Sequence, residues 1–198
     1  MNFNPRPPID IYILPGGAMP ARKSSGAIGY DVCLRAIVSA EEMDKTHPYL
    51  RKTLFDFEKT IDPSIADFVD RRVCSGKKYR ESVYRLEPGK MATCGIGFVT
   101  QMPFPLCYLS LCRSGIASRH HIMVANAPGT IDPDYRGEAG IILFNCGTRS
   151  FYLHRNMRIA QILFTYAVIP QPRKVARYSD LAKTKRGADG FGSTGFRR

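Results

Sequence analysis

Two carboxylates in the stretch NAPGTIDPDYRG, residues 126–137, have a spacing that suits hydrolytic chemistry. Asp132 and Asp134 lie two residues apart, beside Tyr135 and Arg136. If the stretch is extended, both carboxylates lie on one face, and one of them can act as a general base toward water. Taken alone, the stretch is more typical of a polar hairpin loop, because Asp, Pro and Gly favour turns.

Two further segments carry groups that suit a phosphate. Arg113, Ser114 and Gly115 follow an apolar run and combine a guanidinium fork, a hydroxyl and a backbone with no nearby Cβ. Gln161 lies in the segment RIAQ, before a strongly apolar run, where it can hydrogen-bond a ligand or simply lie at a strand edge. Each segment alone is also explained as an ordinary strand end.

The C-terminal tail, TKRGADGFGSTGFRR, is rich in glycine and poor in apolar residues. Its composition predicts a flexible arm. A glycine-rich backbone can fold its N–H groups around phosphate oxygens, and an aromatic ring can stack on a nucleobase. The GxxxxGKS or GxxxxGKT pattern of a Walker loop is missing. The candidate binding residues of the arm are Arg186, Phe191, Gly192, Ser193 and Thr194.

A β-rich domain must position these segments. Many short strands separated by Gly and Pro turns favour an all-β sandwich or barrel. Short apolar runs between such turns predict strands at 9–14, 30–36, from 83, and at 91–100, 106–112, 122–126, 137–144, 150–153 and 159–169.

The segment 39–80 is different, since it is charged and mixed in composition. Apolar residues recur at helical spacing at 50–57 and again at 65–69. Asp62 and Pro63 resemble an N-cap followed by proline at the first helical position. We therefore predict two short helices, in an insertion that covers an edge of the sheet.

The net charge of +12 indicates a polyanionic partner. Nucleic acid, a nucleoside polyphosphate and an anionic membrane all fit the charge. No recognisable nucleic-acid-binding motif is present, and no apolar stretch approaches the roughly 20 residues of a membrane helix. The N-terminus does not have the pattern of a signal peptide. The six cysteines include no CxxC pair and no zinc spacing, which favours reduced thiols in the cytoplasm.

In their joint presence and order, the segments resemble the five motifs of the trimeric dUTPase family. SSGAIGYDV resembles the first motif, RSGIA the second and GTIDPDYRGE the third. RIAQI resembles the fourth motif, and RGADGFGSTG the fifth. The resemblance extends over most of the chain, and its C-terminal motif is the most specific.

The resemblance implies one dUTPase-like domain over residues 1–198, with an insertion at about 39–80 and a C-terminal arm at about 178–198. The implied fold is a jelly-roll-like β-barrel of the β-clip type, with a short helical insertion and a flexible arm. The family forms homotrimers whose active sites draw on all three subunits, and the arm closes over a bound triphosphate. The implied partner is dUTP, without stable nucleic-acid binding and without a membrane.

The resemblance also implies roles for individual residues in hydrolysing dUTP to dUMP and pyrophosphate. Asp132 would activate the attacking water, Tyr135 would pack under the deoxyribose, and the hairpin around Asn126 would bind the uracil edge. Asp31 would support the Mg²⁺ region through water, while triphosphate oxygens would be the main ligands of the metal. Phe191, beside Gly192, would cover the base. The phosphate-binding residues would be Arg113, Ser114, Gly115, Gln161, Arg186, Ser193 and Thr194.

The chain departs from the family pattern at Cys112, where proline is common, at Ile28, where a small residue is usual, and at Pro133, where a small polar residue is more common. A dCTP deaminase of the same fold is one alternative. It would carry a catalytic glutamate in the strand after the third motif, but AGIILFN has no acid. The other alternative is a dUTP-sensing regulatory protein, which the segment 39–80 suggests.

Overall fold

The computed structural model of the chain describes residues 6–74, 78 and 80–188. The chain divides into two units, Met1–Ala167 and Val168–Arg198. Among the described residues, every strand belongs to the first unit, and the second contains one short 3-10 helix, η2 (Tyr178–Asp180). No helix in this described part is both long and apolar enough to cross a membrane.

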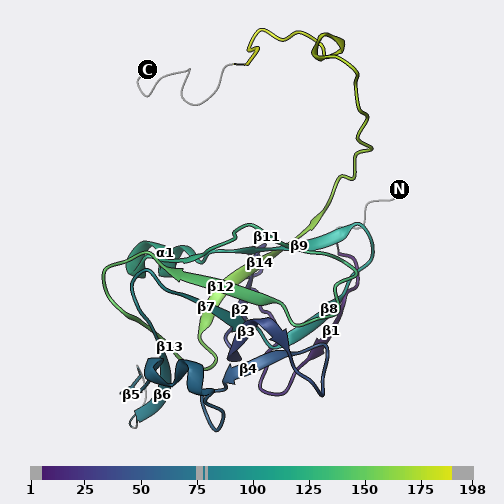
Figure 1. The fold of residues 1–198 in the computed structure, drawn as a ribbon. Helices are drawn as coiled ribbons and strands as arrows, with labels where there is room; N and C mark the ends of the chain where they lie inside the picture. Colours follow the sequence, from purple (N-terminus) through teal and green to yellow (C-terminus); the bar gives the residue numbers. More distant parts are fainter. Residues whose placement is uncertain (1–5, 75–77, 79, 189–198) are drawn as a thin grey trace. The chain divides into compact units, whose positions relative to one another are not determined.

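The described strands of the first unit form four antiparallel sheets (Figure 1). The five-stranded sheet has the order β10 (Ile122–Val124), β12 (Gly140–Asn145), β7 (Met91–Gly95), β3 (Ala36–Met43) and β4 (Arg51–Phe55). The four-stranded sheet has the order β11 (Gly129–Ile131), β9 (Leu106–Leu111), β14 (Arg158–Tyr166) and β2 (Tyr30–Cys33). The two smaller sheets are β13 (Phe151–Leu153), β6 (Arg80–Leu86) and β5 (Val69–Val73), and the pair β1 (Asp10–Ile13) and β8 (Phe98–Gln101).

One hydrophobic core joins the two larger sheets. Tyr108 and Ile162 from the four-stranded sheet belong to the same buried cluster as Ile141 and Leu143 from β12. Burial alternates along β12, because successive side chains of a strand point to opposite faces. The predicted all-β, jelly-roll-like architecture is confirmed. It is a sandwich and not the expected barrel, because the sheets of the described residues do not close.

The helix predicted at 50–57 is wrong, because this part of the segment 39–80 is strand β4. It pairs with β3, where Ile37 lies opposite Phe55. Phe57, one of the apolar residues whose spacing suggested a helical face, packs in the core instead, with its ring centroid 4.4 Å from that of Phe55. Tertiary packing therefore overrides the helical spacing of the apolar residues.

The second predicted helix is present only as one short 3-10 helix, η1 (Pro63–Phe68), followed directly by β5. Its predicted N-cap is confirmed, because the Asp62 side chain accepts a hydrogen bond from the backbone N–H of Ser64. The strand predicted at 91–100 is also interrupted, since it forms two strands, β7 and β8, that pair with different neighbours.

The break between β7 and β8 depends on Gly97. This residue has a φ of +76°, and a Cβ added to it would overlap the Cα of Gly17. Its carbonyl accepts a hydrogen bond from the N–H of Leu14 at 3.0 Å. Glycine is therefore required both for the left-handed conformation and for the close approach of two backbones.

We expect Gly97→Ala to lower the free energy of unfolding by about 2–4 kcal/mol, because it adds backbone overlap to the strain of a positive φ. The matched control is Gly89→Ala, since Gly89 has a φ of +72° but nothing within 4 Å of the added Cβ. That control should cost only about 1 kcal/mol. Urea denaturation measures both changes, and equal losses would contradict a role for the overlap.

Candidate functional site

The register of β14 brings three of the predicted segments together. Gln161 lies opposite Asp31 on β2 and opposite Leu111 on β9. Residues that face each other across an antiparallel ladder project to the same side of the sheet. Arg113 follows Leu111 by two positions along the chain, so it comes close to this row. Asp31, Gln161 and Arg113 therefore meet at one end of the sheet.

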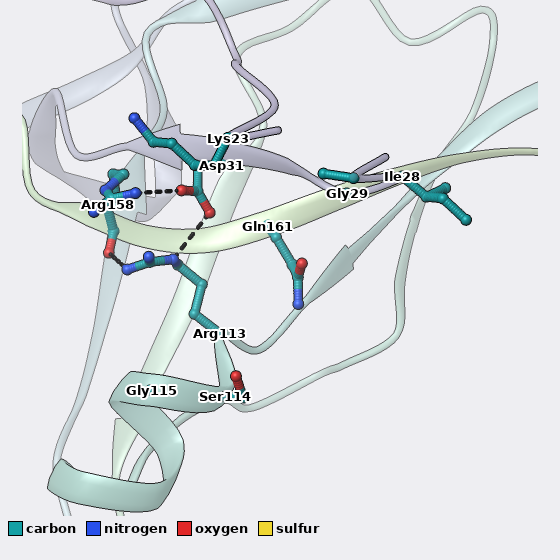
Figure 2. A pocket seen from close by; sticks show the side chains of 10 residues that line it. Lys23, Ile28, Gly29, Asp31, Arg113, Ser114, Gly115, Arg158 and Gln161 are labelled. Carbon is teal, nitrogen blue, oxygen red and sulfur yellow. Dashed lines mark hydrogen bonds and ion pairs between the residues drawn. The ribbon is translucent and has the colours of Figure 1, made fainter. Parts of the chain in front are cut away.

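A cavity of about 390 Å³ lies at this end of the sheet (Figure 2). Five predicted site residues line it: Asp31, Arg113, Ser114, Gly115 and Gln161. Two further cations, Lys23 and Arg158, also line the cavity and were not among the predicted site residues. Arg158 opens the RIAQI segment, so its place in that motif was a signal, whereas Lys23 has no comparable signal.

Asp31 holds the two arginines of the cavity in place, as Figure 2 shows. Its Oδ1 accepts from Arg113 Nε at 3.0 Å, and its Oδ2 accepts from Arg158 Nη1 at 2.8 Å. Arg113 Nη1 also donates to the Arg158 carbonyl at 2.9 Å. With Lys23, three cations face one carboxylate, which leaves the cavity with two excess positive charges. This charge balance suits a polyphosphate.

The amide of Gln161 is held by one hydrogen bond and fills the space beside a glycine. Its Nε2 donates to the carbonyl of Cys112 at 2.8 Å, and its Oε1 lies where a Cβ on Gly29 would be only 2.6 Å away. The departure at Cys112 also has a structural role, since its Sγ accepts from the Val124 N–H at 3.1 Å. Ile28 is 74% exposed, so the larger side chain meets no packing constraint.

Helix α1 (Ser114–His120) forms one wall of the cavity and was missed by the sequence analysis. It begins directly after Arg113, whose backbone is extended, and it ends at His121 in the left-handed conformation. The side chain of Arg119 donates to the carbonyl of Gly115 at 3.2 Å. The predicted strand-end turn is thus the first turn of a helix.

The thiol of Cys33 lies beside these charged groups but is not activated by them. Burial raises the pKa of this thiol, and the opposing effect of Arg158 does not offset it. A thiol with a raised pKa stays protonated near neutral pH and is a poor nucleophile. Among the cavity's neighbours, Cys33 is therefore a packing residue.

Asp132 and Asp134 lie in a turn and not on an extended strand. The Tyr135 N–H donates to the Asp132 carbonyl at 3.2 Å, with Pro133 and Asp134 between them. The expectation that both carboxylates share one strand face is therefore wrong, and the alternative of a turn is confirmed. Both acids line a second cavity of about 430 Å³.

The second cavity is far from the first within one chain. In the pairing of β11 with β9, Ile131 lies opposite Tyr108, so the next residue, Asp132, lies near Cys107. The charge of Asp132 acts on the Cys107 thiol, whose pKa is raised mainly by burial. The six steps along the chain from Cys107 to Arg113 span roughly 20 Å at about 3.3 Å per residue. One chain thus brings together the first, second and fourth motif segments but not the third.

The turn that contains Asn126 is exposed and belongs to neither cavity. It joins β10 to β11, which belong to different sheets, so the expected hairpin is not formed by these two strands. A Cβ on Gly129 would lie 2.7 Å from Asn126 Nδ2 and 2.6 Å from Ser110 Oγ, so glycine is needed here. Ser110 is buried and donates to the Gly129 carbonyl at 3.3 Å. Sequence reasoning did not identify Ser110, since a serine within an apolar strand carries no local signal.

The arm belongs to the second unit of the chain. Arg186 precedes Gly187, which has a φ of +58° and donates its N–H to the Thr184 carbonyl at 3.2 Å. The remaining predicted residues of the arm lie outside the described residues: Phe191, Gly192, Ser193 and Thr194. In the described part of the chain, no group of three or more His, Cys, Asp or Glu side chains is placed to hold a metal ion.

A family model described as dUTPase matches residues 83–195. A deoxyuridine 5'-triphosphate nucleotidohydrolase of Rhizobium etli is 44% identical over 110 residues, which are 56% of this chain and 69% of the relative. The same-named protein of Chlamydia pneumoniae is 42% identical over 115 residues, 58% of this chain and 78% of the relative.

Solved structures support the same fold. A mutant of the Staphylococcus bacteriophage 80alpha dUTPase with dUpNHpp has a TM-score of 0.66 at 18% identity, and the match covers 96% of this chain and 99% of that one. A mutant dUTPase from phage phi11 of S. aureus has a TM-score of 0.58 at 15% identity, and the match covers 87% of this chain and 99% of that one. At these identities the similarity concerns the fold alone.

We expect Lys23→Met to weaken the binding of inorganic pyrophosphate by about two- to fivefold, because an exposed charge contributes up to about 1 kcal/mol. Lys45→Met removes the same charge from an exposed site away from the cavity and is the matched control. Isothermal titration calorimetry at low salt measures both. Equal weakening in the two variants would show that only the net charge matters.

Proposed function

Because the chain belongs to the dUTPase family, we propose that it hydrolyses dUTP to dUMP and pyrophosphate. The observation that carries the proposal is the cavity in which Asp31 fixes Arg113 and Arg158. It presents excess positive charge, a hydroxyl from Ser114 and the fixed amide of Gln161. These groups match the oxygens of a nucleoside triphosphate, and ordered donors bind them without further reorganisation.

Magnesium fits this site as an ion carried by the substrate. The only carboxylate among the residues that line the first cavity, Asp31, already accepts hydrogen bonds on both oxygens from arginines. A protein cage for Mg²⁺ is therefore not what these residues provide, whereas triphosphate oxygens and waters suit the ion. When bound, the metal would neutralise phosphate charge, and Asp31 would support it through water.

Asp132 is the proposed general base, and it must come from another copy of the chain. In one chain Asp132 lies beside Cys107, and the extended chain from Cys107 to Arg113 is roughly 20 Å long by the rise of a strand. A water that Asp132 activates cannot reach a phosphate that Arg113 holds across that distance. We therefore place the complete site between subunits of a homotrimer. The arm residues proposed to close it are Arg186, Phe191, Gly192, Ser193 and Thr194.

Selectivity for the nucleoside is proposed to come from the hairpin around Asn126 and from Tyr135. The hydroxyl of Tyr135 donates to the Glu138 carbonyl at 3.2 Å, which holds the ring in one orientation. A fixed ring under the deoxyribose leaves no room for a 2′-hydroxyl. Main-chain groups of the hairpin would pair with the uracil edge and leave unpaired groups against cytosine, which costs affinity.

The deaminase alternative is not favoured. Strand β12 carries no acid, and its inward side chains include Ile141 and Leu143. Glu138, the acid that precedes the strand, already binds Arg35 at both carboxylate oxygens. We also propose the cytoplasm as the compartment, since Cys33, Cys94, Cys107, Cys112 and Cys146 form no disulfide.

We expect pyrophosphate release with Mg²⁺ from dUTP, and little from dCTP, dTTP or UTP. Asp132→Asn should lower kcat for dUTP by about 10²- to 10⁴-fold, because it removes a general base. Asp67→Asn, at an exposed acid outside both cavities, is the matched control and should keep full activity. Ammonia release from dCTP would support deamination, and dUTP binding without turnover would support a regulatory role.

A site shared between copies predicts complementation. Arg113→Met and Asp132→Asn should each be inactive alone. Co-expressed in equal amounts, they should recover about a quarter of the wild-type activity, because that share of random neighbouring pairs combines an intact cavity with an intact base. Steady-state turnover of the purified mixture measures this recovery. A mixture as inactive as its parts would mean either that both groups act within one chain or that the two variants have not formed mixed oligomers. Size-exclusion chromatography of differently tagged chains shows whether mixed oligomers are present. Inactive mixed oligomers would contradict the shared site.

A further inference from the structure

We propose that Glu138 is a positioning residue that holds the turn at 132–135 and connects it to the inserted segment 39–80. The inference rests on the proposed hydrolysis of dUTP, in which this turn carries Asp132 and Tyr135. No sequence motif assigns a role to the partners of Glu138, and their contacts are long-range. Every polar group of Glu138 has a hydrogen-bond partner.

The carboxylate of Glu138 is fully buried and is held by three donors. Oε1 accepts from Arg35 Nε at 2.7 Å and from the Gly97 N–H at 2.8 Å, and Oε2 accepts from Arg35 Nη2 at 2.6 Å. The side chain of Glu138 is 0% exposed and that of Arg35 is 10% exposed. A two-pronged contact of this kind fixes direction as well as distance.

The backbone of Glu138 is fixed as firmly as its side chain. Its N–H donates to the Tyr49 carbonyl at 2.8 Å, and its own carbonyl accepts from the Tyr135 hydroxyl at 3.2 Å. Tyr135 in turn closes the turn that begins at Asp132. Movement of Glu138 is therefore transmitted to the ring of Tyr135 and to the backbone beside the proposed base.

The inserted segment supplies part of this support. Tyr49 precedes β4, and its ring packs edge-on against Tyr12 with centroids 6.2 Å apart. On β4, Thr53 Oγ1 accepts from Arg35 Nη1 at 3.5 Å. The hairpin of β3 and β4 thus contacts both the backbone of Glu138 and the arginine that binds its carboxylate. The segment 39–80 therefore holds Glu138, which lies three residues after the 132–135 turn.

The fold also leaves space for this carboxylate. A Cβ on Gly95 would lie 2.6 Å from Glu138 Oε1, so only glycine is accommodated on the neighbouring strand. The alternative explanation is that the ion pair only stabilises the sandwich and has no effect on turnover. That explanation predicts a loss of stability when the pair is removed, but no specific loss of turnover in a variant that still folds.

The test is the double variant Arg35→Met with Glu138→Leu. Replacing a buried ion pair by apolar groups of similar volume is often neutral for stability, so this variant should fold. We expect its kcat for dUTP to fall at least about tenfold with a smaller change in KM, and its preference for dUTP over UTP to fall. Arg35→Lys keeps the charge but loses the fork, and it should show a milder loss of kcat.

The matched control removes another ion pair of equal length, Arg85 with Asp70 at 2.6 Å, by Arg85→Met with Asp70→Leu. It should leave kcat and the preference over UTP unchanged. Hydrogen exchange of the peptide that spans 132–138 should rise in the Arg35 and Glu138 variants, and also in Thr53→Val, which removes the side-chain acceptor that β4 offers to Arg35. It should not rise in the control.

Unchanged kcat and nucleotide preference in a folded Arg35→Met, Glu138→Leu variant would overturn the proposal, and so would equal losses in the control. Unchanged exchange at 132–138 in Thr53→Val would overturn the link to the segment 39–80. A wild-type protein that turns over no nucleotide would instead contradict the proposed function. The wild-type assay therefore separates the two failures.

Discussion

The antiparallel pairing of β14 with β2 on one side and β9 on the other is the interaction on which the first cavity depends. It places Gln161 in one row with Asp31 and Leu111, although these residues are far apart in the sequence. A slip of one residue would turn Gln161 into the core and bring Ile162, which is fully buried, to the surface. The core therefore enforces the register, and the register assembles the cavity.

Charge pairing then gives the cavity its fixed form. Asp31 lies between Arg113 and Arg158, so neither guanidinium has to be ordered when an anion arrives. Glu138 does the same for a different part of the fold, since it joins Arg35, Gly97 and the turn that follows β11. In both places a single carboxylate orders several donors, and the cost of ordering them is met during folding.

The sequence predicted what depends on local chemistry. Gly and Pro turns located most strands, and the Asp62 cap of η1 follows from its own neighbours. The helix expected at 50–57 was wrong because pairing with β3 and packing in the core decide that segment. The predicted cavity residues followed from family motifs, whereas Lys23 lies outside the quoted motifs. The pair of Arg35 with Glu138 could not be predicted, because a contact between residues 103 positions apart leaves no local pattern.

The separation of the two cavities means that a chain can be correctly folded and still incomplete. Under the proposed arrangement, an isolated subunit would bind a polyphosphate at Arg113 but would hold its own Asp132 out of reach. Turnover would then depend on protein concentration, so that dilution below the dissociation constant of the oligomer stops catalysis before it unfolds any chain. In that arrangement, the association of subunits is a chemical requirement and not only a source of stability.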